Sequence, residues 1–159
     1  MEKLSQILWR ERELLETLLF KLEEEQLVLA AGRTRWLARS AREVASVLET
    51  IRETEVLRAV AAEEAAAELG LGPNPSLRAL AEAADEPWQT LLLDHHEAFT
   101  MVTHEIASLA DANRELITTG YRSARETLMT LGEGTQAYAA DGSAVSVPEV
   151  RRPMVDWSL

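Results

Sequence analysis

The longest periodic segment of the sequence predicts a single unbroken helix over residues 88–131. Its apolar residues recur at alternating spacings of three and four, the pattern of a helix that packs against other helices. Pro87 suits a first turn, Asp85 can cap it, and Gly132 and Gly134 favour a stop. At 1.5 Å per residue the helix would be roughly 66 Å long, so the other segments have to pack along it. The stripe consists of Phe99, Val102, Ile106, Leu109, Asn113, Leu116, Gly120, Ala124, Leu128 and Leu131.

Three more helices are predicted, over residues 3–31, 34–69 and 76–84. Gly32 breaks the first pattern, and Thr34 is expected to cap the second helix. Because the break is short, the first two helices should form an antiparallel hairpin. The segment 70–75 contains two glycines and two prolines, which separate the second helix from the third.

The first of these helices has two glutamates within its apolar stripe. Glu11 and Glu25 occupy positions in the same alternation of three and four as the leucines. An unpaired carboxylate is costly to bury, so we expect both glutamates at the solvent-exposed edge of the stripe. The leucines of the stripe are Leu4, Leu8, Leu15, Leu18, Leu22 and Leu29.

The composition favours an all-α protein. Apolar residues make up 47% of the chain and aromatic residues 5%, and leucine and alanine dominate the periodic segments. We therefore predict an antiparallel, coiled-coil-like helical bundle over residues 1–131, which includes the long C-terminal helix. A mobile C-terminal tail should follow over residues 132–159.

Charge and targeting signals narrow the function. The net charge of −11 disfavours binding to nucleic acid, because an acidic surface repels phosphates. No apolar run is long enough to span a bilayer, so direct insertion into a membrane is not expected. The N-terminal residues lack the pattern of a signal peptide, which favours a cytoplasmic location. The absence of cysteine excludes disulfides and thiolate metal sites.

The tail has no helical periodicity. Asp141 and Gly142 indicate a turn, and residues 143–147 alternate like a strand but have no evident partner strand. Fast amide exchange is therefore expected over 143–159. The terminal residues could be a docking peptide or a disordered extension, and the roles of Arg151, Arg152 and Trp157 stay open.

Helix lengths predict an exposed surface near the end of the long helix. If this helix runs antiparallel to the second, its greater length should leave it overhanging by roughly 12 Å. Leu128, Leu131 and Tyr121 would then lack a full partner within the chain. Exposed apolar surface of this kind usually indicates an interaction site, and Gly120 and Ala124 would let a partner helix approach closely.

No residue pattern predicts an enzyme, a cofactor or a metal site. His95, His96 and His104 lie on the long helix, but none has a glutamate three residues before it, as a di-iron bundle requires. We expect them to be solvent-facing or half-buried. Asn113 has two readings: a seam residue that sets helix register, or a residue turned to solvent.

Two motifs resemble the FlgN family of flagellar type III export chaperones. The segment from Asn113 to Ile117 is similar to the family's Asn-then-aliphatic stretch in its long helix. The segment from Tyr138 to Gly142 is similar to its Tyr-x-x-Asp-Gly motif, and it follows the helix as in the family. The order of hairpin, break, long helix and tail resembles the family over the whole chain.

The resemblance implies a cytosolic chaperone for the hook-associated proteins of the hook-filament junction. In the family the C-terminal helix region holds the C-terminal segments of these substrates, and the motif tyrosine is implicated in docking on the cytoplasmic domain of the export gate protein FlhA. Docking is thus expected at Tyr138, with Asp141 and Gly142 as its turn. The expected substrate-binding residues are Asn113, Leu116, Ile117, Gly120, Tyr121, Ala124, Leu128 and Leu131.

Two other functions satisfy the same periodicity. A coiled-coil adaptor or oligomerisation scaffold would show similar stripes, and a ferritin-like metal-binding bundle is the more remote alternative. The pattern is compatible with either a monomer or a homodimer, and it does not distinguish between the two junction proteins as substrates.

Overall fold

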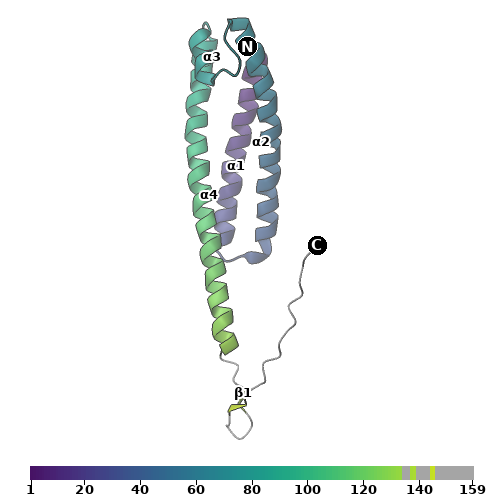
Figure 1. Ribbon diagram of the computed structural model, residues 1–159, viewed down its shortest axis with the longest axis vertical. Coiled ribbons are helices and arrows are strands. Elements are labelled where there is room, and N and C mark those ends of the chain that lie inside the picture. The colour runs from purple at the N-terminus through teal and green to yellow at the C-terminus, as the bar shows by residue number, and fades with distance from the viewer. Residues whose placement is uncertain (134–136, 139–143, 146–159) are drawn as a thin grey trace. The chain divides into compact units, whose positions relative to one another are not determined.

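The computed structural model describes residues 1–133, 137–138 and 144–145 (Figure 1). The all-α fold predicted from the sequence is confirmed, and the helices begin and end within two residues of their expected bounds. The helices are α1 (Glu2–Ala30), α2 (Thr34–Leu69), α3 (Leu77–Ala83) and α4 (Trp88–Glu133), and two short strands follow, β1 (Ala137–Tyr138) and β2 (Ala144–Val145).

The chain divides into two compact units, Met1–Thr118 and Thr119–Leu159, whose boundary lies inside α4. The first unit contains α1, α2, α3 and the first part of α4. The expected division into a bundle over 1–131 and a docking tail over 132–159 stays a prediction. The expected mobility of the tail falls mostly on residues outside the described part of the chain.

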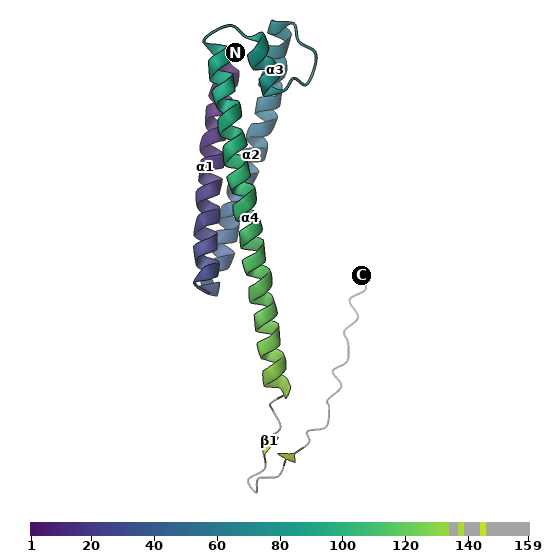
Figure 2. The ribbon, with the colours of Figure 1, turned by 90° about the vertical axis from the view of Figure 1, so that its left-hand side faces the viewer.

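Within the first unit, α1 and α2 form the antiparallel hairpin that the short break predicts (Figure 1). The first part of α4 lies beside α1 and runs in the same direction, as Figure 2 shows from a second side. The short helix α3 lies near the end of the bundle where α2 stops and α4 begins. The core therefore runs along the line where α1, α2 and α4 meet.

The first two helices each end at a glycine in the left-handed conformation. Gly32 has a φ of 61° and Gly70 a φ of 70°, values that residues with a Cβ rarely adopt. Beyond Gly70 the Leu71 N–H donates to the Ala66 carbonyl oxygen at 2.9 Å, the hydrogen bond that closes a Schellman cap. The equivalent bond follows Gly32, so both predicted breaks are confirmed.

The starts of two helices differ from expectation. Thr34 is the first residue of α2, and the N-cap residue Arg33 makes no side-chain cap hydrogen bond. The prediction that Thr34 caps α2 is therefore wrong, because the link from α1 is so short that Thr34 is already helical. At the start of α4 the Glu86 carboxylate accepts a hydrogen bond from the Thr90 hydroxyl at 2.8 Å. Asp85 contributes through its backbone carbonyl, which accepts from the N–H groups of Trp88 and Gln89.

The leucine stripe of α1 is buried in two core clusters. The first cluster joins all four helices, and Leu4 and Leu8 of α1 are almost fully buried in it. The second joins α1 to Ile51 of α2, with Phe99, Val102, Ile106 and Leu109 of α4 packed against it. Burial of each large apolar side chain stabilises the fold by about 1.5–3 kcal/mol before entropy is subtracted. The buried α1 leucines are Leu4, Leu8, Leu15, Leu18 and Leu22.

Glu11 is buried between these clusters, which corrects the expectation that it lies at an exposed edge. Its relative exposure is 5%, and its Oε2 atom lies 3.0 Å from Nε of Arg58 in α2. Burial raises the pKa of the Glu11 carboxyl, and the Arg58 charge opposes that rise. The carboxylate can be buried because a cation from the neighbouring helix accompanies it. Glu25 is half-buried, as expected for the edge of the stripe.

We expect Arg58→Met to lower the free energy of unfolding by about 3 kcal/mol, because it leaves the buried Glu11 carboxylate without a cation. The double variant Glu11→Leu, Arg58→Met should recover most of that loss, since no uncompensated charge remains. Urea denaturation followed by circular dichroism measures both changes. An Arg58→Met variant as stable as the unaltered chain would show that Glu11 does not need this partner.

Candidate functional site

The buried part of α4 ends at Asn113. This side chain is 2% exposed, and its Nδ2 donates to the Leu22 carbonyl oxygen at 2.9 Å and to the Glu25 carboxylate at 3.1 Å. Both acceptors belong to α1, so the amide aligns α4 with α1 at one register. The reading of Asn113 as a register residue is therefore favoured, and the reading that turns it to solvent is wrong.

This position of Asn113 also corrects its inclusion among the substrate-binding residues. A side chain enclosed between α1 and α4, and bonded to α1, offers no surface to a partner while the bundle is intact. The sequence motif that contains Asn113 thus has two parts in the structure. Asn113 faces the core, whereas Leu116 and Ile117 are exposed.

Every side chain of α4 from Arg114 to Leu131 is exposed. Large apolar groups occur along this length, and the exposed fraction rises from 37% at Leu116 to 71% at Tyr121 and 70% at Leu128. Apolar residues that remain in water usually indicate a surface that a partner covers. The predicted contact residues that the structure leaves exposed are Leu116, Ile117, Gly120, Tyr121, Ala124, Leu128 and Leu131.

Gly120 has no structural reason within the described chain to be a glycine. A Cβ placed at this position would have no heavy atom within 4 Å, yet a glycine inside a helix costs about 0.5–1 kcal/mol relative to alanine. Ala124, one turn later, is also small and exposed. Two small residues on one helix face allow another backbone to approach closely, which agrees with a surface that receives a helix.

Met129 is an exposed apolar residue that the stripe did not predict. It is 55% exposed, but it points away from the stripe, since it is rotated by about 100° from Leu128 and by about 160° from Leu131 around the axis of α4. No spacing rule connects Met129 to the stripe, so only the exposure in the structure identifies it. Its chemistry and position make it a matched control for the predicted face.

The proposed docking motif begins in a strand. Ala137 pairs with Val145, and Tyr138 with Ala144, in an antiparallel register. This corrects the expectation that the segment 143–147 has no partner strand, because β1 supplies one. Asp141 and Gly142 lie outside the described residues, as do Arg151, Arg152 and Trp157. Docking through Tyr138 stays a prediction.

The three histidines of α4 lie in different surroundings. His96 and His104 are exposed, as expected. His95 is 1% exposed, with its ring 4.8 Å from that of Trp9 in an edge-to-face arrangement. This burial corrects the prediction that His95 is solvent-facing or half-buried. Neither ring nitrogen of His95 has a hydrogen-bond partner among the described residues. Among the described residues, no three histidine, aspartate or glutamate side chains are grouped to hold a metal ion.

Burial lowers the pKa of His95, nearby Arg12 lowers it further, and Asp94 opposes the shift. The unfolded chain therefore takes up this proton at a higher pH than the folded chain. The folded state has its full stability above the unfolded pKa of about 6.5 and loses stability as the pH falls below that value.

We expect the melting temperature to fall as the pH decreases from about 8 to about 5.5, and His95→Leu to reduce the size of that fall. The exposed His96→Leu variant is the matched control and should keep the full dependence. Thermal melts at a series of pH values measure the difference. An identical pH dependence in all three proteins would show that protonation of His95 does not destabilise the bundle.

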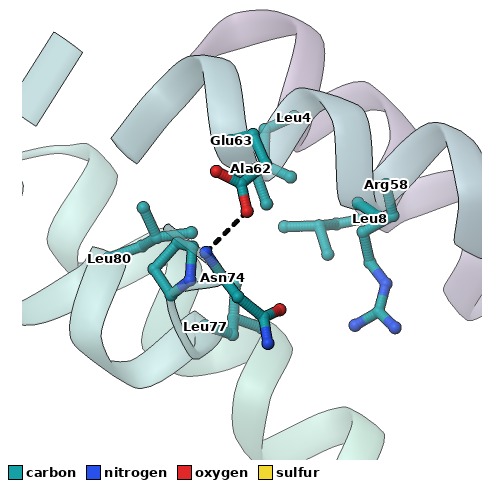
Figure 3. Close-up of a pocket in the computed structure, with 10 residues that line it drawn as sticks. Leu4, Leu8, Arg58, Ala62, Glu63, Asn74, Leu77 and Leu80 are labelled. Atoms are coloured by element: carbon teal, nitrogen blue, oxygen red, sulfur yellow. Dashed lines mark hydrogen bonds between the residues drawn. The ribbon is translucent and has the colours of Figure 1, made fainter. Parts of the chain in front are cut away.

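A small cavity lies where α3 packs on the hairpin (Figure 3). Its volume is about 150 Å³, below the roughly 300 Å³ at which sites for small organic ligands begin. The Asn74 N–H donates to the Glu63 carboxylate at 2.5 Å across it, and Asn74 has a φ of 56°. This arrangement holds the connection between α2 and α3 in place, and we assign the cavity a structural role.

One comparison with known proteins identifies a family. A family model described as FlgN protein matches residues 1–146, a range that includes the bundle, the exposed part of α4 and both strands. No curated protein and no solved structure matches the chain. No helix in the described residues is long and apolar enough to cross a membrane.

Proposed function

We infer the function of the chain from the family to which it belongs, the FlgN family of flagellar export chaperones. Chaperones of this family bind flagellar proteins. We propose that this chain is cytosolic, that it binds the C-terminal helices of the hook-associated proteins at the hook-filament junction, and that it delivers them to the type III export gate.

The observation that supports this proposal is the exposed apolar face of α4 after Asn113. The face consists of Leu116, Ile117, Gly120, Tyr121, Ala124, Leu128 and Leu131, and it is exposed along its whole length. A substrate helix laid along it would remove these side chains from water, with its own apolar residues spaced by three and four. The contribution from a leucine that becomes fully buried is about 1.5–3 kcal/mol.

The position of this face also suits a chaperone. None of its side chains belongs to the two core clusters, so a substrate can cover the face without displacing the core. Among the described residues, the last buried anchor before the face is Asn113. The bundle can therefore stay folded whether or not a substrate is bound, as repeated binding and release require.

Replacing Leu128 and Leu131 with aspartate should weaken substrate binding at least about 100-fold, because two apolar contacts of roughly 1.5 kcal/mol each are lost. Helix content should stay nearly unchanged, since both side chains are exposed in the free chain. Calorimetric titration with the C-terminal peptide of each junction protein measures the affinity and shows which substrate is preferred.

Met129→Asp is the matched control for the single variant Leu128→Asp, because both introduce one negative charge at an exposed apolar residue, and Met129 lies about 100° around α4 from Leu128 and about 160° from Leu131. It should leave the affinity within a few-fold of the unaltered chain. If helix content collapses in the Leu128 and Leu131 variant, these leucines support the fold. If Met129→Asp weakens binding as much as Leu128→Asp, the contact face is placed on the wrong side of the helix.

Tyr138 is the proposed docking residue for the cytoplasmic domain of FlhA, with Asp141 and Gly142 as the turn that follows it. The proposal rests on the Tyr-x-x-Asp-Gly pattern and on its place after the long helix. A tyrosine provides a large contact with few rotatable bonds, which is why tyrosines are frequent hot spots at interfaces. Its nearest neighbours in sequence are alanines, so no adjacent apolar cluster would bury it.

Tyr138→Ala should weaken binding to the gate domain by about thirtyfold, the effect of losing a hot spot of about 2 kcal/mol. It should leave substrate affinity and the melting temperature unchanged. Tyr121→Ala removes the other tyrosine of the chain, and the reverse pattern is expected there: weaker substrate binding with gate binding intact. A Tyr138→Ala variant that loses substrate affinity but keeps gate affinity would contradict the assignment.

A further inference from the structure

A groove between α1 and α4 is separate from the exposed apolar face. It consists of two adjoining hollows of about 470 and 380 Å³, which share Leu19 and Glu105. On α4 the groove extends from Asp94 to Ala112, about 27 Å along the helix axis. All of its residues belong to the first unit, where α1 and α4 lie side by side in both views (Figures 1 and 2).

The floor of the groove is apolar and is held in place by the core. Leu19 of α1 and Val102 and Leu109 of α4 are half-buried there. Val102 and Leu109 also pack against the second core cluster, so they cannot move away without disturbing it. Met101 on the rim is 59% exposed, and its flexible thioether chain can adapt to a bound side chain.

Both rims of the groove are acidic. Arg12 is the arginine of the rims, and it is already ion-paired with Glu16 at 3.2 Å. In the described part of the chain, the other rim carboxylates have no basic side chain within 4.0 Å. The exposed rim carboxylates are Glu16 and Glu23 on α1 and Asp94, Glu97 and Glu105 on α4.

We propose that this groove binds a basic amphipathic helix of a partner protein. Lysine or arginine side chains on the two flanks of that helix would pair with the acidic rims, while apolar residues spaced by three and four contact the floor. A helix of about 18 residues matches the length of the groove. Because the groove shares no residue with the apolar face of α4, this binding does not depend on the proposed chaperone function.

The other occupants fit less well. An extended peptide would leave backbone groups unpaired, because the walls are helices whose own N–H and C=O groups are bonded internally. Nucleic acid would be repelled by the carboxylates. A second copy of the chain has a net charge of −11, so it would meet a surface of like charge.

The test uses the full chain and a fluorescein-labelled synthetic peptide of about 18 residues, with leucine on one helix face and lysine on both flanks. A companion peptide has glutamate in place of every lysine. We expect the basic peptide to bind at least tenfold more tightly than the companion, with an affinity that falls as salt is raised. Equal binding of the two peptides would overturn the proposal.

Charge reversal at Glu97 and Glu105 should weaken binding of the basic peptide at least tenfold. The control variant, Glu49→Lys with Glu53→Lys, changes the net charge equally at exposed positions of α2 that do not line the groove. The control should bind within about threefold of the unaltered chain, as expected for exposed charges at a distance. If the variant Glu97→Lys with Glu105→Lys and the control weaken binding equally, the effect is due to net charge alone. That result would overturn the proposal.

A third variant tests whether the chain occupies its own groove. Arg151 and Arg152 form the one pair of adjacent basic residues near its C-terminus, and both are replaced with alanine. Equal binding of the peptide to this variant and to the unaltered chain supports a partner protein as the occupant. Binding that appears only after Arg151→Ala and Arg152→Ala would show that the tail fills the groove, and the proposal would be wrong.

Discussion

The burial of the α1 leucine stripe is the interaction on which the other helices depend. Leu4 and Leu8 lie in the cluster that joins all four helices, and Leu15, Leu18 and Leu22 form most of the second cluster. The helices α2 and α4 pack along this stripe and not only against each other. The Glu11–Arg58 pair separates the two clusters and places a polar contact at one defined height of the bundle. Such a contact favours one alignment of α1 and α2, because any shift would leave a buried carboxylate without its cation.

Local sequence patterns were sufficient to predict the helices but not the side-chain contacts between them. The glycines at 32 and 70 and the spacing of apolar residues give the helix ends, because both signals act within a few residues. The burial of Glu11 could not be predicted in this way, since its partner Arg58 is distant in sequence. His95 occupies a core position where spacing alone would place an apolar residue. The strand pairing of Tyr138 with Ala144 was missed because two-residue strands have no periodicity.

The candidate site was predicted in part, and Asn113 explains the limit. Stripe spacing treats Asn113 and Leu116 as members of one surface, because they lie one turn apart on the same face of α4. The structure separates them: the amide bonds to α1, and the next stripe residue is exposed. The residue at which a stripe becomes exposed depends on the length and position of the neighbouring helices. The spacing of apolar residues within one helix contains no information about either. The same helix therefore provides a core face before Asn113 and an exposed apolar face over residues 114–131.

The exposure of α4 after Asn113 has an energetic consequence for release of a bound protein. Since the side chains at 114–131 are all exposed, helicity over these residues depends on local propensity, which is marginal for an isolated segment of this length in water. Gly120 lowers it further. A ligand that covers the segment must also fix its conformation, and the entropy lost in doing so subtracts from the contact free energy. A complex formed on this segment would combine a large contact area with moderate affinity, which is consistent with the proposed carrier function.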